Sequence, residues 1–227
     1  MYVLKSSALP VLGGLLSFSG ISAALAISYF NNDLVWETSS YVYISEFAGR
    51  FPADVPFIWT INLAAALFFV SLHFLCTKIR TKGGRQCSRF LRFMSFLSAL
   101  VLSLVSIVST YDSDKMHSIL TLTFFACVFF ASLFMVQGSW IIRNSNPKHY
   151  KLSICLFKSG LLVLLSLTLL SLLYFTWYVG TALEVYLMYS VFSEYVAVVI
   201  LILLFTMMGY DLHNDVIHFY NELPATF

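Results

Sequence analysis

The sequence predicts an all-α, polytopic membrane helix bundle with six transmembrane helices and with both termini on the cytosolic side. Three observations predict this fold class. Of the 227 residues, 59% are hydrophobic and only 11% are charged, whereas soluble domains carry roughly a quarter charged residues. Six apolar stretches each have about the 20 residues that a helix needs to cross a bilayer. Basic residues gather at alternate ends of these stretches, and this bias sets the orientation.

The six stretches are predicted to form one membrane domain over residues 1–227. Membrane-spanning strands would be shorter and would alternate in polarity, so helices are the expected structure. The first stretch follows Lys5 but is too long for the apolar core of a cleaved signal peptide, so we expect it to be retained. The predicted helices cover residues 9–29, 57–77, 93–111, 118–140, 159–179 and 187–210.

The first predicted helix carries small residues on one face. Gly13, Ser17, Gly20 and Ala24 follow one another at spacings of four, three and four, which places them on one stripe of a helix. Small side chains let helix backbones approach closely in a membrane. This stripe is therefore predicted to face another helix and not lipid.

The connector of residues 30–56 is predicted to be an ordered polar cap on the luminal or extracellular side. Pro52 and Pro56 prevent a continuous helix through it, and Pro56 is expected to be the first residue of the second helix, where no donor is missed. Its candidate functional residues are those that carry charge, a hydroxyl or a special backbone. They are Ser45, Glu46, Gly49, Pro52 and Asp54.

The connector of residues 78–92 is predicted to be a basic cytosolic loop. All but two of the 13 basic residues, Arg50 and Lys115, fall on the predicted cytosolic side; Lys158 is assigned there, at the edge of the fourth connector. The cations of the basic loop either only fix the topology or also bind anionic lipid head groups. Phosphoinositides or a cytosolic partner would then be the ligand. These cations are Lys78, Arg80, Lys82, Arg85, Arg89 and Arg92.

Three polar residues are predicted to lie within the outer half of the membrane. Glu194 falls about two turns inside the sixth helix, where an ionised acid costs a few kcal/mol. Asn62 lies at similar depth in the second helix, and His117 opens the fourth. We expect the three to meet beneath the cap. They form either a polar pocket for a lipid head group, a proton or an ion, or a hydrogen-bonded clasp that fixes helix order.

The sequence offers little for catalysis. The four cysteines lack paired CxxC spacing, no HExxH motif occurs, and no glycine-rich phosphate loop is present. We therefore assign no catalytic residue, no metal ligand and no cofactor, and whether the protein is an enzyme stays open, with the balance against it. A net charge of +2 on a chain that lies mostly within lipid also argues against nucleic acid as a partner, and leaves membrane lipids as the expected one.

Short motifs resemble the DRAM/FRAG/Sfk family of six-helix membrane proteins. Tyr-Ile-Ser-Glu at 43–46, followed by glycine, proline and an acid, and Phe-Ile…Ile-Asn at 57–62 are similar to that family's first luminal loop and second helix. The family includes the damage-regulated autophagy modulators, the GPI-lipid remodelling factors and the yeast Sfk proteins. Further matches fall at the expected places in later helices. They are His117, Gln137, residues 193–195 and Asp211.

The resemblance implies a function that the residues alone do not. It is greatest to the autophagy-modulator branch, which implies a non-enzymatic protein that modulates autophagy or endolysosomal membranes, in lysosomes, endosomes or the plasma membrane. An alternative is a lipid-handling factor. It would act in GPI-lipid remodelling in the endoplasmic reticulum or Golgi, or in phospholipid and phosphoinositide organisation at the plasma membrane. A weaker alternative, which uses Glu194, is a channel or proton-coupled carrier.

Overall fold

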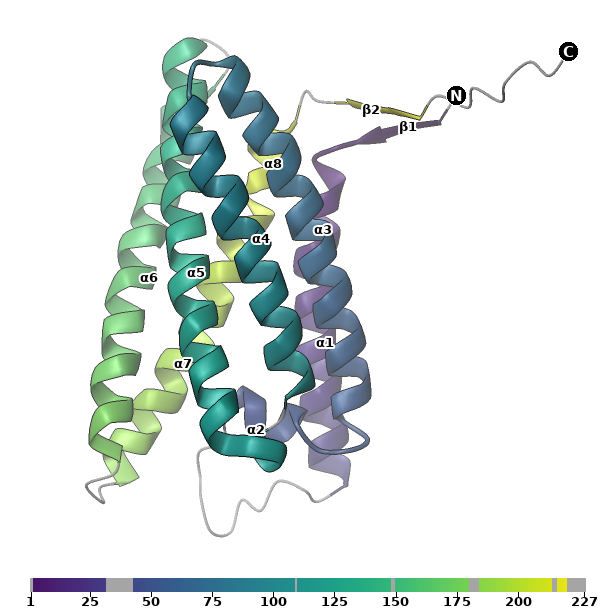
Figure 1. The fold of residues 1–227 in the computed structure, drawn as a ribbon, viewed down its shortest axis with the longest axis vertical. Helices are drawn as coiled ribbons and strands as arrows, with labels where there is room; N and C mark the ends of the chain where they lie inside the picture. The colour runs from purple at the N-terminus through teal and green to yellow at the C-terminus, as the bar shows by residue number, and fades with distance from the viewer. Residues whose placement is uncertain are drawn as a thin grey trace, which may run out of the picture.

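The computed structural model describes residues 2–31, 43–108, 110–147, 150–179, 184–213 and 216–219. Within them, six helices are long and apolar enough to cross a membrane, and Figure 1 shows these helices side by side in one bundle. This confirms the predicted class of a six-helix membrane protein. The six are α1 (Ala8–Phe30), α3 (Asp54–Thr81), α4 (Arg85–Ile107), α5 (Thr110–Ser145), α6 (Leu152–Val179) and α7 (Glu184–Thr206).

Short elements lie at the two ends of the bundle. Helix α2 (Ile44–Ala48) lies at one end, here called the α2 end (Figure 1). At the opposite end, here called the terminal end, β1 (Tyr2–Lys5) pairs antiparallel with β2 (Val216–Phe219), next to α8 (Met208–Asp211). This strand pair adds to the all-α fold that the sequence predicts. The first and the last described segments thus lie at one end of the bundle, which the basic residues predict to be cytosolic.

Several helices extend past the apolar stretches that predicted them. The expected basic loop of residues 78–92 is mostly helical, because α3 continues to Thr81 and α4 begins at Arg85. Lysine and arginine are good helix formers, so a helix need not end where the hydrocarbon ends. The remaining turn contains Gly83 at φ 91°, a left-handed conformation that glycine adopts without strain.

The cap also differs in detail from its prediction. Helix α3 begins at Asp54, so Pro56 lies in its first turn and not at its first position. The missing N–H still costs no helical bond there, since the first four donors of a helix have no partner within it. Residues 32–42 of the predicted 30–56 connector lie outside the described residues.

The small-residue stripe of α1 packs against α3, as predicted. Gly13, Ser17, Gly20 and Ala24 are all buried. A Cβ atom added to Gly20 would lie 1.7 Å from Thr60 Oγ1 and 2.8 Å from Thr60 Cβ. The Thr60 side chain therefore fills the space beside Gly20 and leaves no room for a side chain on α1.

Two hydrophobic clusters form the interior. The larger one joins α3, α4, α5, α6 and α7 along the bundle. The smaller one lies beneath the cap, where Ile44, Phe47 and Ala48 of α2 pack with Ala24 of α1 and with Ala53. The cap is thus anchored in the protein by apolar contacts, and it positions the polar groups of the α2 end.

Candidate functional site

Helix α2 is tied to α1 and α7 by hydrogen bonds at both of its ends. The Ile44 N–H donates to Glu194 Oε2 at 3.1 Å, and the Ser28 hydroxyl donates to the Phe47 carbonyl at 2.8 Å. Ile44 opens α2, so its N–H is one of the donors that a helix leaves without an internal partner. A carboxylate is favoured at that position because it complements the helix dipole. Glu194 therefore caps α2.

Tyr43 strengthens the same junction. Its N–H donates to Glu46 Oε2 at 2.9 Å, which forms half of a capping box, and its hydroxyl donates to Ser190 Oγ at 2.8 Å. Burial raises the pKa of the Tyr43 phenol, partly offset by its hydrogen bond to Ser190. The phenol thus stays protonated at neutral pH and can serve as the donor.

The three predicted pocket residues each form hydrogen bonds with different groups. The Asn62 amide donates to Ser106 Oγ at 2.8 Å and to the Ile58 carbonyl at 2.7 Å. His117 Nδ1 lies 2.5 Å from the Val108 carbonyl, so in the neutral ring Nδ1 is the donor and Nε2 is left as the acceptor. Glu194, His117 and Asn62 are therefore not joined to one another directly.

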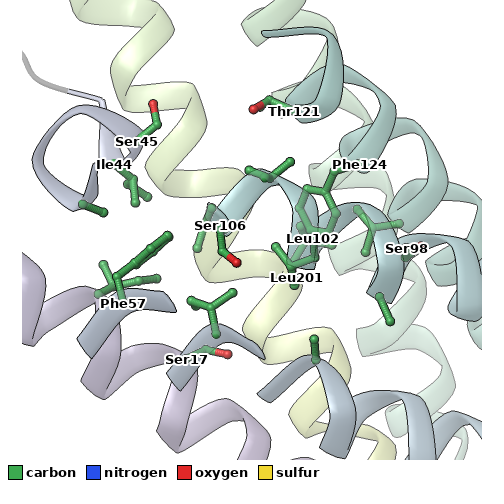
Figure 2. A pocket seen from close by; sticks show the side chains of 18 of the residues that line it. Ser17, Ile44, Ser45, Phe57, Ser98, Leu102, Ser106, Thr121, Phe124 and Leu201 are labelled. Atoms are coloured by element: carbon green, nitrogen blue, oxygen red, sulfur yellow. The ribbon is translucent and has the colours of Figure 1, made fainter. Parts of the chain in front are cut away.

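A cavity of about 430 Å³ nevertheless brings two of the three together. Glu194 and His117 both line it, as does Ser106, the partner of Asn62. Helices α1, α2, α3, α4, α5 and α7 all contribute to its walls. Figure 2 shows Ser45 on α2 and Thr121 on α5 facing each other across the upper part of this space, with Phe57, Ser106 and Leu201 below them. We call it the α2-end cavity.

The charged groups that line the cavity lie near the cap, and its walls along the bundle are mostly apolar. Three serines of those walls, Ser17, Ser95 and Ser98, donate their hydroxyls to carbonyls of their own helices. Ser45, Gly49 and Asp54 of the cap line it, whereas Glu46 is held in the capping box. Pro52, the other candidate residue of the cap, is half-buried. The walls away from the cap include Phe68, Leu102, Phe124, Val128 and Phe205.

Two polar atoms at the cavity have no partner. Among the described residues, Asp54 Oδ1 and Thr121 Oγ1 are buried and make no hydrogen bond, and both residues line the α2-end cavity. A buried polar atom without a partner costs roughly 1–3 kcal/mol, so native proteins satisfy nearly all of them. These atoms are suited to a polar group that enters from the cavity.

A buried ion pair lies at the terminal end. Lys158 Nζ is 2.5 Å from Asp211 Oδ2, and both side chains are fully buried. Ser139 Oγ lies 3.1 Å from each oxygen of this carboxylate, and the Tyr150 hydroxyl donates to Oδ1. Lys78 Nζ donates to the Asp211 main-chain carbonyl at 2.5 Å. The network joins α3, α5, α6 and α8 with Tyr150, which lies two residues before α6.

The location of Lys158 corrects the sequence analysis, which assigned it to the edge of the fourth connector. Helix α6 begins at Leu152, so Lys158 is nearly two turns inside it. Its buried neighbours on the helix, Cys155, Leu161 and Leu165, lie on the same stripe at helical spacing. That periodicity was a signal in the sequence that Lys158 faces the interior.

The predicted cationic loop residues are placed at the surface. Arg80, Lys82, Arg85, Arg89 and Arg92 are exposed at the terminal end, and Lys78 is half-buried. Among the described residues, no group of three or more His, Cys, Asp or Glu side chains could hold a metal ion. The arrangement of polar groups at both ends is thus suited to binding and to holding helices together.

The fold and the cavities define an integral membrane protein built as a six-helix bundle. The chain belongs to the Frag1/DRAM/Sfk1/Cwh43P N-terminal domain family, whose model matches residues 5–214. This confirms the DRAM/FRAG/Sfk resemblance. A comparison with curated proteins and one with solved structures found no match.

Two substitutions of Glu194 should separate its charge from its role as a cap. Glu194→Gln keeps an acceptor for the Ile44 N–H, so stability should change by less than about 1 kcal/mol. Glu194→Leu leaves that N–H without a partner and should lower the free energy of unfolding by roughly 1–3 kcal/mol. Hydrogen exchange over residues 44–48 should then rise in the leucine variant alone. Equal protection in both variants would contradict the capping role.

Proposed function

We propose that this protein is a non-enzymatic membrane protein that binds a lipid in the α2-end cavity. A lipid chain would lie along the apolar walls, and the head group would meet the polar groups beneath the cap. The observation that carries the proposal is the chemistry of this one cavity, which combines charged and hydroxyl groups beneath the cap with mostly apolar walls along the bundle. Ligand sites typically have volumes of about 300–1,000 Å³ and combine apolar walls with a few placed polar groups.

Specific atoms would receive the head group. Asp54 Oδ1 and Thr121 Oγ1 are buried, line the cavity and lack a partner within the described chain. Nε2 of His117 is the ring nitrogen not used by the Val108 carbonyl. A head group with both donors and acceptors would satisfy all three. This requirement favours a zwitterionic or hydroxyl-bearing head group over a simple anion, because Glu194 and Asp54 also line the cavity.

A pair of matched variants tests lipid binding. Ala99 lines the cavity, whereas Ala66 is exposed on the lipid-facing side of α3. Ala99→Phe should reduce the lipid that co-purifies with the protein by about tenfold or more. Each buried methylene contributes about 0.8 kcal/mol, and a factor of ten corresponds to only about 1.4 kcal/mol. The measurement is quantitative mass spectrometry of lipid retained in mild detergent.

The control for this test is Ala66→Phe. It adds the same ring outside the cavity and should leave the amount of retained lipid unchanged. Thermal unfolding of both variants establishes that each is folded. Equal lipid retention by folded Ala99→Phe and by the natural protein would contradict the proposal.

At the level of the cell, we propose that the protein modulates autophagy or endolysosomal membranes. Support comes from the resemblance of its Ile-Ser-Glu and Ser-Glu-aromatic motifs, at 44–46 and 193–195, to the autophagy-modulator branch. Loss of the gene should alter autophagic flux and leave GPI-anchored proteins at normal surface levels. A tagged protein should reside in lysosomes, endosomes or the plasma membrane.

The same cavity favours one alternative, a lipid-handling factor in GPI-lipid remodelling or in phospholipid and phosphoinositide organisation. A GPI-remodelling factor would reside in the endoplasmic reticulum or Golgi, and its loss would reduce GPI-anchored proteins while autophagic flux stays normal. Re-expression of Glu194→Gln and Glu194→Leu then distinguishes a pocket from a clasp. A Glu194→Gln variant that is folded but inactive indicates a functional pocket, whereas an active Glu194→Gln together with a degraded Glu194→Leu indicates a clasp.

A further inference from the structure

A second cavity, of about 600 Å³, lies at the terminal end of the bundle. We call it the terminal-end cavity. The ends of α3, α5 and α8 and the beginning of α6 form its walls, and three lysines from two different segments line it. Lys82 and Lys151 are exposed, and Lys78 is half-buried with its Nζ on the Asp211 carbonyl.

The acid in this cavity does not cancel the lysines. Asp211 lines the cavity, but its carboxylate is paired with Lys158, which lies 2.5 Å away and is fully buried. Tyr150 and Ser139 donate further hydrogen bonds to it. Burial, and then the nearby Asp211 carboxylate, raise the pKa of Tyr150, so its hydroxyl stays protonated and remains a donor. The charge of Asp211 is thus compensated within the protein. Among the described residues that line the cavity, the exposed Lys82 and Lys151 therefore present positive charge to it.

The rest of the lining suits a phosphate group close to lipid. Thr81 and Asn146 supply neutral polar groups, and Ile142 and Ile154 supply apolar wall. A cleft lined by one sign of charge and bounded by low-dielectric walls concentrates the electrostatic field. Lysine binds phosphate as a point charge, and cations at a membrane surface attract anionic lipids.

We propose that the terminal-end cavity binds a phosphate group between Lys82 and Lys151, presented by the head group of an anionic lipid. This site goes beyond the proposed function, because it lies at the opposite end of the bundle from the α2-end cavity. It also differs from a diffuse basic surface, since Arg85 and Arg89 do not line it. Free phosphate offers the same chemistry as a lipid head group, so the test includes both sources.

The test uses the full chain in nanodiscs of uncharged lipid. Short-chain phosphatidic acid and inorganic phosphate are the two probes, and binding is measured by microscale thermophoresis. Lys82→Gln/Lys151→Gln removes two exposed cations of the cavity. It should weaken the binding of phosphatidic acid, so that the Kd rises by about tenfold or more. Arg85→Gln/Arg89→Gln removes the same charge from exposed positions of α4 and should weaken it less than about twofold.

Each outcome of the test bears on the proposal. Phosphatidic acid binding that depends on the two lysines, with no measurable phosphate binding, supports a lipid head group as the source. Phosphate binding that depends on the same lysines and displaces the lipid supports the site with a soluble source. An equal loss in both double variants, or no saturable binding of either probe, would overturn the proposal. Circular dichroism and thermal unfolding show that the variants are folded.

Discussion

Lys158→Met is expected to lower the free energy of unfolding by about 3–5 kcal/mol, because it leaves the Asp211 carboxylate buried without its counter-charge. The side chains of Lys158 and Asp211 are fully buried and their charged atoms are 2.5 Å apart. The methionine side chain has a similar length, so the loss reports mainly the missing charge and not a cavity. The effect is measured as the free energy of unfolding in detergent micelles, by steric trapping or by thermal denaturation.

Removing the acid together with the lysine should restore most of that stability. In Lys158→Met/Asp211→Leu/Tyr150→Phe, no charge and no Tyr150 hydroxyl is left buried without a partner. Apolar replacement of a buried pair is often neutral or stabilising. The triple variant should therefore be more stable than Lys158→Met alone. If both lose the same amount, Lys158 stabilises the fold by packing and not through its charge.

Lys151→Met is the matched control for charge. Lys151 lies seven residues before Lys158 and is exposed, so its loss should change stability by less than about 0.5 kcal/mol. A large effect at Lys151 would mean that net charge, and not the buried pair, controls stability at this end of the bundle.

Gly20→Ala is expected to destabilise the contact between α1 and α3 by roughly 1–3 kcal/mol. The added Cβ would lie 2.8 Å from Thr60 Cβ and closer still to Thr60 Oγ1, so either the Thr60 side chain or the helix backbone must shift. This loss should appear although alanine favours a helix by about 1 kcal/mol over glycine. Reversible unfolding in micelles measures the effect, and Thr60→Ala, which removes the closest atom, should recover part of it.

Gly160→Ala is the control for this prediction. Gly160 lies within α6, and a Cβ added there meets no atom within 4 Å. The same substitution should then raise stability by up to about 1 kcal/mol through helix propensity alone. An unaffected Gly20→Ala would contradict the close approach of α1 and α3. A destabilised Gly160→Ala would show that a loss at Gly20 is not specific to that contact.

The number of membrane-spanning helices could be predicted from the sequence, because the thickness of a bilayer sets a length that can be counted along the chain. The stripe from Gly13 to Ala24 could be predicted in the same way, because its spacing follows the helical repeat and its burial needs only a neighbouring helix. Helix ends were less predictable. Backbone hydrogen bonds continue into water, and so α3 reaches Thr81 and α4 begins at Arg85.

The partners of the polar residues could not be predicted in the same way. Glu194 stood out as an acid in an apolar span, but its partner is a main-chain N–H 150 residues away, on a helix of five residues. Asn62 and His117 lie at the same end of the bundle as Glu194. Their partners are main-chain carbonyls nearby in the sequence and, for Asn62, a serine of α4. Lys158 was assigned to a connector because its charge was given more weight than its position among Cys155, Leu161 and Leu165.

The network around Asp211 constrains how the protein is made. Its carboxylate and main chain bind Lys78, Ser139, Tyr150 and Lys158, and the adjacent Leu212 carbonyl accepts a hydrogen bond from Ser6. All five partners are synthesised before Asp211, since translation runs from the N-terminus. The early spans are therefore made without these hydrogen bonds and without the counter-charge of Lys158, and the network can form only after the last span has been synthesised.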